Sequence, residues 1–381
     1  MKIKLQKALI LLIGGAVLLT SILFIIKYKV WENNKAKNNY AFIVESKNEN
    51  ENDESNENLK KKLGQNLIVG IPDPVLDEKT KEILHYIKPA GIVLYRRNYE
   101  SDLQLKDLIA QLQKISNKDT GIFYFIMLDE EPEGAVRLGL LKNIFPLGLP
   151  DWKTIEKDIS ILANIGINVE LAPIADFPFN DNAFIKRRVP VKNVEDLTAF
   201  NRTFINLLKE YKISATLKHF PGMGIFIEDP HRELPYSNIQ QEILDKSLKI
   251  FKDGIDHGAD FVMTGHAVYK NIDPNYIATF SSKIVKDLLI KQLGFQGIVI
   301  TDDLSDMLLT IKEINLTDAA IQALKAGHHL IVFSHKLEKT KEIFDEIFVK
   351  VKADPKLQSI IKDNYQKITD FKKLRRKFES I

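Results

Sequence analysis

Eight short apolar runs, each followed by a segment long enough to form a helix, constrain the fold of this chain more than any other feature. Each run holds four to seven residues and is rich in Val, Ile, Leu or Phe. Buried strands of this length that alternate with helices indicate a parallel sheet covered on both faces. The runs are Leu67–Ile71, Gly91–Tyr95, Phe123–Leu128, Ile167–Pro173, Ser214–Lys218, Phe261–Thr264, Gly297–Thr301 and His329–Phe333. Eight such units predict a single (β/α)8 TIM barrel over residues 63–381.

An open, doubly wound parallel sheet is the alternative arrangement for strands that alternate with helices. Such sheets usually contain fewer strands, and a Gly-x-Gly-x-x-Gly turn follows the first strand of the dinucleotide-binding ones. No such turn follows the run at 67–71. The sequence therefore favours the barrel.

Residues Ala8 to Ile26 fit a membrane anchor. These nineteen residues are apolar or small and carry no charge, and lysines precede and follow them. At helical rise they span about 28 Å, close to the roughly 30 Å of a bilayer core. A cleavable signal peptide has a shorter apolar core of about 7–15 residues that ends in small residues. Because this run ends in Phe24-Ile25-Ile26, we predict an uncleaved transmembrane helix within residues 1–30.

The next segment, residues 31–62, is dominated by Asn, Glu and Lys. It holds too few apolar side chains to offset the entropy of ordering the chain, so we predict a disordered linker. Lysines flank the apolar segment on both sides, and its early position favours a cytoplasmic N-terminus. We therefore expect a single-pass protein of the cytoplasmic membrane with its barrel on the extracytoplasmic side.

Composition excludes several kinds of site. The 381 residues include no cysteine, which rules out disulfides, thiolate chemistry and cysteine-based zinc sites. The net charge of +3 gives no reason to invoke a nucleic-acid partner. No His-x-His pair follows the first apolar run, so we expect no metal ion.

Polar residues follow nearly every apolar run. They are Arg96-Arg97-Asn98, Asp129-Glu130-Glu131, Asp176, Lys218-His219, His266, Asp302-Asp303 and Ser334-His335. The carboxyl ends of barrel strands meet at one rim, where barrel enzymes place their active sites. A salt bridge to a neighbouring loop explains one charged strand end, but not seven of eight. The pattern predicts an active site on that rim.

The densest part of the pattern contains Lys218, His219, Asp229 and His231 within fourteen positions. Because Gly and Pro interrupt this segment, we expect these side chains on a loop. An ordinary surface loop with two satisfied histidines would show the same spacing. The residue types leave three reactions open: glycoside hydrolysis, an aldol reaction through a Schiff base on Lys218, and hydrolysis at a two-metal site.

Several motifs resemble glycoside hydrolase family 3, and more narrowly its single-domain β-N-acetylglucosaminidases. The likeness covers roughly Leu63 to Phe378. The motifs are Leu94-Tyr95-Arg96-Arg97-Asn98, the segment from Asp129 to Arg137-Leu138, Lys218-His219-Phe220-Pro221-Gly222-x-Gly224 followed by Asp229-x-His231, and the segment from Gly294 to Ser305.

The resemblance implies a retaining mechanism with a covalent glycosyl-enzyme intermediate. Carried over by position, Asp302 would be the nucleophile, and His231 would be the acid/base, oriented by Asp229. Asp303 is expected to be structural, because adjacent strand residues point to opposite faces.

Substrate binding would fall, by the same resemblance, to several charged or imidazole side chains. They are Asp129, Arg137, Lys218, His219 and an arginine after the fourth run, where Arg187 and Arg188 both stand and Arg188 is favoured. We add His266 from its place at a strand end. The expected partner is an N-acetylglucosamine-containing glycan, either peptidoglycan-derived or chitin-like. No cofactor is implied, and we expect a monomer.

Three residues depart from the pattern of the family. Met223 stands where His or Leu is usual, Pro230 replaces the usual Ser or Thr between Asp229 and His231, and Gly134 stands where an arginine is usual. Proline fixes φ and removes an N–H donor. Two alternatives therefore remain beside the hydrolase: a degenerate barrel that binds cell-wall glycan without cleaving it, and a related N-acetylglucosaminide phosphorylase.

Overall fold

The computed structural model describes residues 55–189, 191–307 and 314–379. The chain divides into two units, residues 1–59 and 60–381, and the second contains the barrel. The anchor predicted within residues 1–30 lies outside the described residues, as does most of the predicted linker. In the part of the chain that the structure describes, no helix combines the length and the apolar character needed to cross a bilayer.

The predicted C-terminal end of the disordered linker, at residue 62, is wrong. Residues 55–64 are helical, although we expected disorder up to residue 62. The charged composition obscured this helix, whose last turn contains the fully buried Leu63. The Nζ of Lys60 also lies 5.1 Å from the ring centroid of Tyr86. Packing against the barrel therefore offsets a weak local preference for helix.

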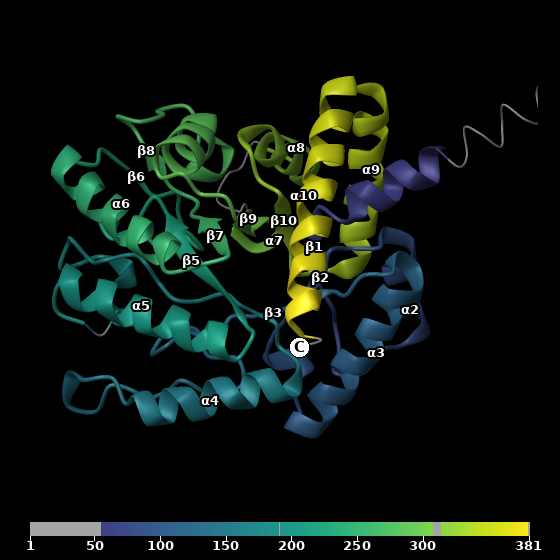
Figure 1. The fold of residues 1–381 in the computed structure, drawn as a ribbon. Helices are drawn as coiled ribbons and strands as arrows, with labels where there is room; N and C mark the ends of the chain where they lie inside the picture. Colours follow the sequence, from purple (N-terminus) through teal and green to yellow (C-terminus); the bar gives the residue numbers. More distant parts are fainter. Residues whose placement is uncertain (1–54, 190, 308–313, 380–381) are drawn as a thin grey trace, which may run out of the picture. The chain divides into compact units, whose positions relative to one another are not determined.

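The predicted barrel is confirmed: eight parallel strands close in the order β1-β10-β9-β7-β5-β4-β3-β2. Each predicted apolar run contributes one strand. The strands are β1 (Leu67–Gly70), β2 (Gly91–Leu94), β3 (Phe125–Leu128), β4 (Val169–Glu170), β5 (Ser214–Phe220), β7 (Phe261–Thr264), β9 (Ile298–Asp303) and β10 (Leu330–Phe333). Figure 1 shows helices packed around these strands.

Five of the surrounding helices begin at side-chain caps that the sequence supplies. Side chains of Asp77, Ser101, Asp151, Asn193 and Asn315 accept hydrogen bonds from backbone N–H groups three residues on. The helices are α2 (Glu78–Ile87), α3 (Asp102–Thr120), α4 (Trp152–Ile165), α5 (Val194–Glu210), α6 (Gln241–Asp256), the π-helix η5 (Lys283–Gln292), α7 (Leu304–Met307), α8 (Leu316–Ala326), α9 (Leu337–Ala353) and α10 (Pro355–Glu379). Short 3-10 helices are η1 (Arg96–Asn98), η2 (Pro146–Gly148), η3 (Phe184–Arg188) and η4 (Ala278–Phe280).

The barrel interior is a packed apolar core. Its members include Ile68, Val93, Phe125, Met127, Val169, Phe261, Ile300 and Val332, all buried. Helix α10 adds Ile368 to this core, and Phe371 packs against it. The ring centroid of Phe371 lies 5.6 Å from that of Phe261. The last helix therefore contributes directly to the core beneath the active rim.

Strand β5 is longer than predicted. It runs to Phe220, so Lys218 and His219 lie on a strand end and not on a loop. The Gly and Pro residues that suggested a loop begin only at Pro221. Beyond that point, β6 (Tyr236–Ser237) pairs with β8 (Val268–Tyr269) and joins the loop after β5 to the loop after β7.

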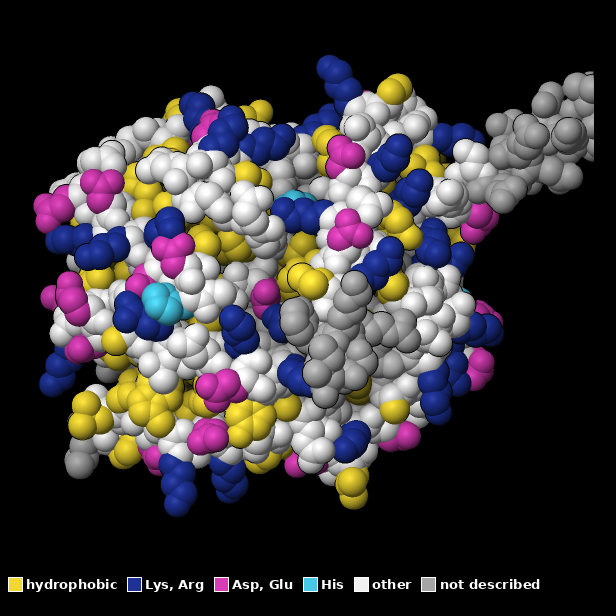
Figure 2. Space-filling model, in the orientation of Figure 1, with side chains coloured by type: hydrophobic (Ala, Val, Ile, Leu, Met, Phe, Trp, Pro, Cys, Tyr) yellow, Lys and Arg dark blue, Asp and Glu magenta, His cyan; other side chains and the backbone are white. Residues whose placement is uncertain are grey.

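On the face that Figure 2 shows, Lys and Arg side chains are scattered among Asp and Glu side chains. This mixture agrees with the small net charge of +3. A strongly basic stripe, which is the electrostatic mark of a nucleic-acid surface, is not visible on that face.

Candidate active site

A pocket of about 570 Å³ opens at the carboxyl ends of the strands. The polar residues predicted to meet at this rim supply much of its lining. The lining residues are Val93, Tyr95, Asp129, Gly134, Ala135, Arg137, Leu171, Arg188, Lys218, His219, His231, Met263, Asp302, Asp303, Val332 and His335. The pocket is thus apolar at its base and strongly polar along its walls.

Ion pairs connect the side chains along one wall. Lys218 Nζ lies 2.5 Å from Asp129 Oδ1 and 2.5 Å from Glu131 Oε1. Asp129 also pairs with Arg137, at 3.1 Å, and Glu131 pairs with Arg188 through both carboxylate oxygens. Three cations therefore share two carboxylates, and each side chain is fixed by its neighbours.

This wall keeps its charges despite burial. Burial by itself would raise the pKa of Glu131, but Lys218 and Arg188 outweigh it and hold that pKa well below its usual value. Burial would likewise lower the pKa of Lys218, but Asp129 and Glu131 raise it above its usual value. Lys218 is therefore a permanent cation at neutral pH, which is a poor state for the amine of a Schiff-base enzyme.

Gly134 is held against Glu131. A Cβ atom added at Gly134 would lie 1.9 Å from Oε2 of Glu131. The carboxylate of Glu131 also accepts a hydrogen bond from the N–H of Ala135, at 2.8 Å. A side chain at position 134, where the family usually has an arginine, would therefore meet the Glu131 carboxylate that pairs with Lys218 and Arg188.

Arg137 is positioned by the loop that carries it. Glu130 accepts hydrogen bonds from the N–H groups of Arg137, Leu138 and Gly139, at 2.6 to 3.1 Å. The guanidinium of Arg137 then lies 5.0 Å from the ring centroid of Tyr95. A cation over an aromatic face is a favourable arrangement, so Tyr95 helps to fix Arg137 at the pocket wall.

Asp302, at the end of β9, reaches the pocket with its side chain 20% exposed. Its Oδ2 lies 3.8 Å from Nε2 of His219, and its Oδ1 accepts a hydrogen bond from the N–H of Asp303. Burial alone would raise the pKa of Asp302, but His219, His266 and this hydrogen bond outweigh burial and lower it. The carboxylate is therefore ionised and open to a bound molecule.

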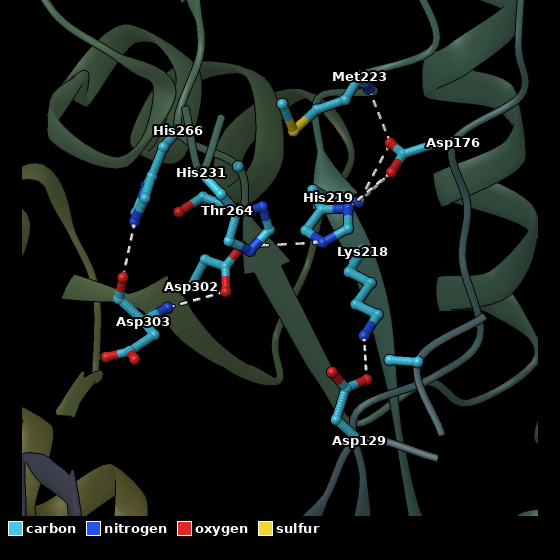
Figure 3. Close-up of polar contacts among 12 residues, drawn as sticks. Asp129, Asp176, Lys218, His219, Met223, His231, Thr264, His266, Asp302 and Asp303 are labelled. Carbon is cyan, nitrogen blue, oxygen red and sulfur yellow. Dashed lines mark hydrogen bonds and ion pairs between the residues drawn. The ribbon is translucent and has the colours of Figure 1, made fainter. Parts of the chain in front are cut away.

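A second carboxylate fixes the ring of His219 (Figure 3). Asp176, fully buried, lies 2.7 Å from Nδ1 of His219 and also accepts hydrogen bonds from the N–H groups of His219 and Met223. Because Nδ1 faces a carboxylate, it carries the proton, and Nε2 is directed toward Asp302. Met223, a departure from the family pattern, therefore contributes its backbone to this contact.

The carboxylate of Asp303 is held by residues that follow two strands, β9 and β10. It accepts hydrogen bonds from the N–H and hydroxyl groups of Ser305 and from those of Ser334, which follows β10. This agrees with the expected structural role of Asp303, although its side chain also lines the pocket.

His231 and Asp229 form a separate pair on the loop after β5. Nδ1 of His231 lies 2.7 Å from Oδ1 of Asp229, which also accepts the backbone N–H of His231. The side chain of His231 is 54% exposed and lines the pocket. Burial acts to raise the pKa of Asp229, but its hydrogen bonds from His231 outweigh burial and lower it. The pair can therefore hold and release a proton at Nε2 of His231.

Two of the predicted binding residues lie elsewhere. Arg187 is exposed and is not among the lining residues, whereas Arg188 is. His266 is buried behind Asp302 and Asp303, with Nε2 at 3.3 Å from the Asp303 carbonyl (Figure 3). It is not among the residues that line the pocket.

Sequence reasoning missed several residues of the site. Glu131, Asp176, Tyr95 and His335 were seen only as polar or aromatic residues at strand ends. Their roles depend on partners distant in sequence, such as the pairing of Asp176 with His219 across 43 positions. Among the described residues, no cluster of three or more His, Asp or Glu side chains could hold a metal ion.

Comparisons with known proteins agree with this geometry. Residues 58–370 match the Glycosyl hydrolase family 3 N terminal domain. A beta-hexosaminidase of Psychromonas ingrahamii is 30% identical over 305 residues, which cover 75% of this chain and 88% of that protein. A β-N-acetylhexosaminidase from Beutenbergia cavernae has a TM-score of 0.74 at 27% identity, over 82% of this chain and 98% of its own.

A glycoside hydrolase family 3 β-N-acetylglucosaminidase from a Paenibacillus strain is also similar in structure. Its TM-score is 0.75 at 27% identity, over 84% of this chain, and this chain spans 63% of its length. The family match covers most of the present chain and includes every strand of the barrel. This protein therefore belongs to glycosyl hydrolase family 3 and is a glycoside hydrolase.

Proposed function

We propose that this protein is a retaining β-N-acetylglucosaminidase that removes terminal β-linked N-acetylglucosamine from an oligosaccharide. The observation that carries the proposal is the presence in one pocket of an ionised carboxylate, Asp302, and of a separate imidazole–carboxylate pair, His231 with Asp229. A retaining glycosidase needs these two functions, a nucleophile and an acid/base.

In the first step, Asp302 attacks the anomeric carbon and forms a glycosyl ester. The bond from that carbon to the leaving oxygen breaks, and His231, protonated, gives its Nε2 proton to this oxygen. Asp229 stabilises the imidazolium through its contact with Nδ1. The neutral imidazole that results is the base required for the next step.

In the second step, a water molecule attacks the anomeric carbon of the ester. His231 takes one proton from that water through Nε2, and the bond to the oxygen of Asp302 breaks. Two inversions at the same carbon retain its configuration. His231 and Asp302 both return to their starting charge, so no external proton donor is consumed.

The wall formed by Asp129, Lys218 and Arg137 would bind the sugar. Its carboxylate accepts hydrogen bonds from hydroxyl groups, and its two cations donate them to hydroxyl or carbonyl oxygens. Because the three side chains are already paired, little ordering is needed when the substrate arrives. The choice of N-acetylglucosamine is supported by the similarity to the Paenibacillus β-N-acetylglucosaminidase. We propose peptidoglycan-derived or chitin-like oligosaccharides as its natural substrates.

The test is hydrolysis of a chromogenic β-N-acetylglucosaminide by the protein and by its Asp302→Ala and His231→Ala variants. We expect turnover by the parent, none by Asp302→Ala, and rescue of the latter by azide, which attacks in place of the carboxylate and forms an α-linked glycosyl azide. Product analysis with and without phosphate separates hydrolysis from phosphorolysis. A parent that binds N-acetylglucosamine without turnover would refute the proposal.

We also propose that residues 8–26 anchor the protein in the cytoplasmic membrane, with the barrel outside the cytoplasm. Their uncharged apolar length supports this, and it rests on the sequence alone. Extraction of cell membranes with carbonate tests it, because an anchored protein stays in the pellet. Protease added to spheroplasts should then digest the barrel if it lies outside.

A further inference from the structure

A chain of buried polar contacts begins at His266, behind the pocket. Nε2 of His266 lies 3.3 Å from the carbonyl oxygen of Asp303, the residue next to Asp302. Nδ1 of His266 lies 2.7 Å from the hydroxyl oxygen of Thr279, in η4. Both nitrogens of this imidazole are therefore occupied, and neither faces the pocket.

The chain continues from Thr279 through the barrel wall. The hydroxyl of Thr279 lies 3.1 Å from that of Thr264, at the end of β7, which lies 2.9 Å from Nε2 of His328. Nδ1 of His328 lies 3.1 Å from the carbonyl oxygen of Ala323 in α8. The four side chains are at most 2% exposed. Four polar groups kept in the barrel wall away from the substrate call for a role other than binding.

The two ends of this chain determine where its protons lie. Both ends are carbonyl oxygens, which only accept, so His266 carries a proton on Nε2 and His328 carries one on Nδ1. In a neutral imidazole the other nitrogen must then accept a hydrogen bond. Thr279 donates to His266, and Thr264 donates to His328, so neither hydroxyl has a proton left for the 3.1 Å contact between them. The carbonyl oxygens thus set the tautomer of each ring, and each hydroxyl satisfies the ring nitrogen that accepts.

Thr279 can also serve a protonated His266. Its hydroxyl oxygen lies 3.1 Å from the carbonyl oxygen of Gly265 as well. If Nδ1 of His266 gains a proton and donates to Thr279, the hydroxyl turns and donates to Gly265. The charged groups that face His266 are Asp302, Asp303 and His219. The charge of one of them, Asp302, changes when it forms and loses a glycosyl ester.

We infer that His266 is a positioning residue for Asp302, and that Thr279 holds its Nε2–H against the Asp303 carbonyl throughout the reaction. The N–H of Asp303 donates to Oδ1 of Asp302 at 2.8 Å, so the two residues move together. Fixing the Asp303 peptide therefore fixes the attacking carboxylate. This inference rests on the proposed role of Asp302 as nucleophile.

The test compares Thr279→Val, which removes the hydroxyl at constant shape, with Thr279→Ser, which keeps it. We expect Thr279→Val to lower kcat about tenfold, the size of a small misplacement of a reacting group, with KM within about twofold. Without the hydroxyl, a proton on Nδ1 of His266 would have no acceptor, so His266 gains its second proton only at lower pH. Asp302 then loses a neighbouring cation, and the acid limb of kcat/KM should move to higher pH, into the range where circular dichroism still shows the folded protein. Thr279→Ser should restore both values.

Several outcomes would overturn the inference. An unchanged acid limb in Thr279→Val, whatever its thermal stability, would leave His266 only a structural role, as would equal losses in the Val and Ser variants. If Thr279→Val does not fold, Thr279→Ala removes the same hydroxyl, with Thr279→Ser again as its control and a shift in the same direction expected. Turnover by Asp302→Ala would instead refute the proposed function. Loss of turnover in Asp302→Ala, with kcat and the acid limb unchanged in Thr279→Val, would refute only the present inference.

Discussion

At the scale of single residues, Glu131 decides the state of the pocket wall. Its side chain is fully buried and pairs with both Lys218 and Arg188. In Glu131→Gln these cations lose their shared anion while they remain buried. We expect the free energy of unfolding to fall toward the lower end of about 3–5 kcal/mol, because Asp129 still pairs with Lys218. Urea unfolding followed by fluorescence measures this change.

The pH dependence of that change has a definite sign. The pKa of Glu131 is lower in the folded protein than its usual value of 4.5. Its stabilising contribution is therefore present above pH 4.5 and is lost as the pH falls toward the folded value. The wild type should lose this contribution on acidification and Glu131→Gln should not. The matched control is Glu78→Gln, whose exposed pair with Lys81 should contribute little.

Gly134 provides a second test at this scale. Because a Cβ at this position meets the Glu131 carboxylate, Gly134→Ala should destabilise the protein by about 1–3 kcal/mol, as overpacking does. The double variant Glu131→Ala with Gly134→Ala should lose less than the sum of the two single losses. Additive losses in this cycle would contradict the contact. Restoring the arginine that is usual in the family should therefore impair the pocket wall.

The sequence predicted which residues line the pocket where those residues belong to a motif. Asp129, Lys218, His219 and Asp302 were named from strand ends and Arg137 and His231 from the family resemblance, and all six line one pocket. It kept both Arg187 and Arg188 and favoured Arg188, which lines the pocket; only the turn of η3 decides which side chain points inward. It placed His266 in the pocket, because strand-end position does not reveal depth.

At the scale of elements, the pairing of β6 with β8 holds the loop that carries His231. The amide of Asn271 spans the same join: its Nδ2 donates to the Ile239 carbonyl at 2.8 Å, and its Oδ1 accepts the Ile239 N–H at 3.0 Å. Asn271→Ala removes both contacts and should let the loop shift. We expect kcat to fall about tenfold or more. Asn238→Ala, at an exposed position of the same loop, is the control and should stay near the parent rate.

Helix α10 gives a prediction of stability. Its Lys372 is fully buried, with Nζ 2.6 Å from the Ala90 carbonyl oxygen and 4.5 Å from the ring centroid of Phe125. Burial lowers the pKa of this amine well below 10.5. Because the unfolded chain binds the proton more tightly, stability should rise with pH up to about 10.5.

Replacing Lys372 with Met should abolish that rise. It removes a buried amine but leaves the Ala90 carbonyl without this donor, so the free energy of unfolding at neutral pH should change by less than about 2 kcal/mol. The neighbouring Lys373 is exposed, and Lys373→Met should keep the wild-type dependence on pH. Equal pH slopes for wild type and Lys372→Met would contradict the assignment.

The sequence predicted those elements whose local composition is apolar enough to show that they are buried. All eight strands coincide with apolar runs, because both faces of the sheet are covered. The helix at 55–64 was missed, because its charged residues favour no packing partner locally, and the end of β5 was missed because Pro221 and Gly222 suggested an earlier stop. The residue at which a strand ends depends on its register with the neighbouring strands, and the sequence does not show that register.

At the scale of the whole molecule, acid affects the fold and the reaction through different carboxylates. The pKa of Asp302 is lowered by nearby imidazoles and the Asp303 N–H despite burial, so this carboxylate stays ionised below the usual aspartate value of 3.8. Glu131 loses its stabilising contribution as the pH falls below 4.5. We therefore expect the activity lost on acidification to follow unfolding and not protonation of Asp302. Near-UV circular dichroism and initial rates, measured at each pH and again after return to neutral pH, separate the two. A fall in rate while the dichroism is unchanged would show that Asp302 titrates first, and would place its carboxylate in a less cationic environment than His219 and His266 provide.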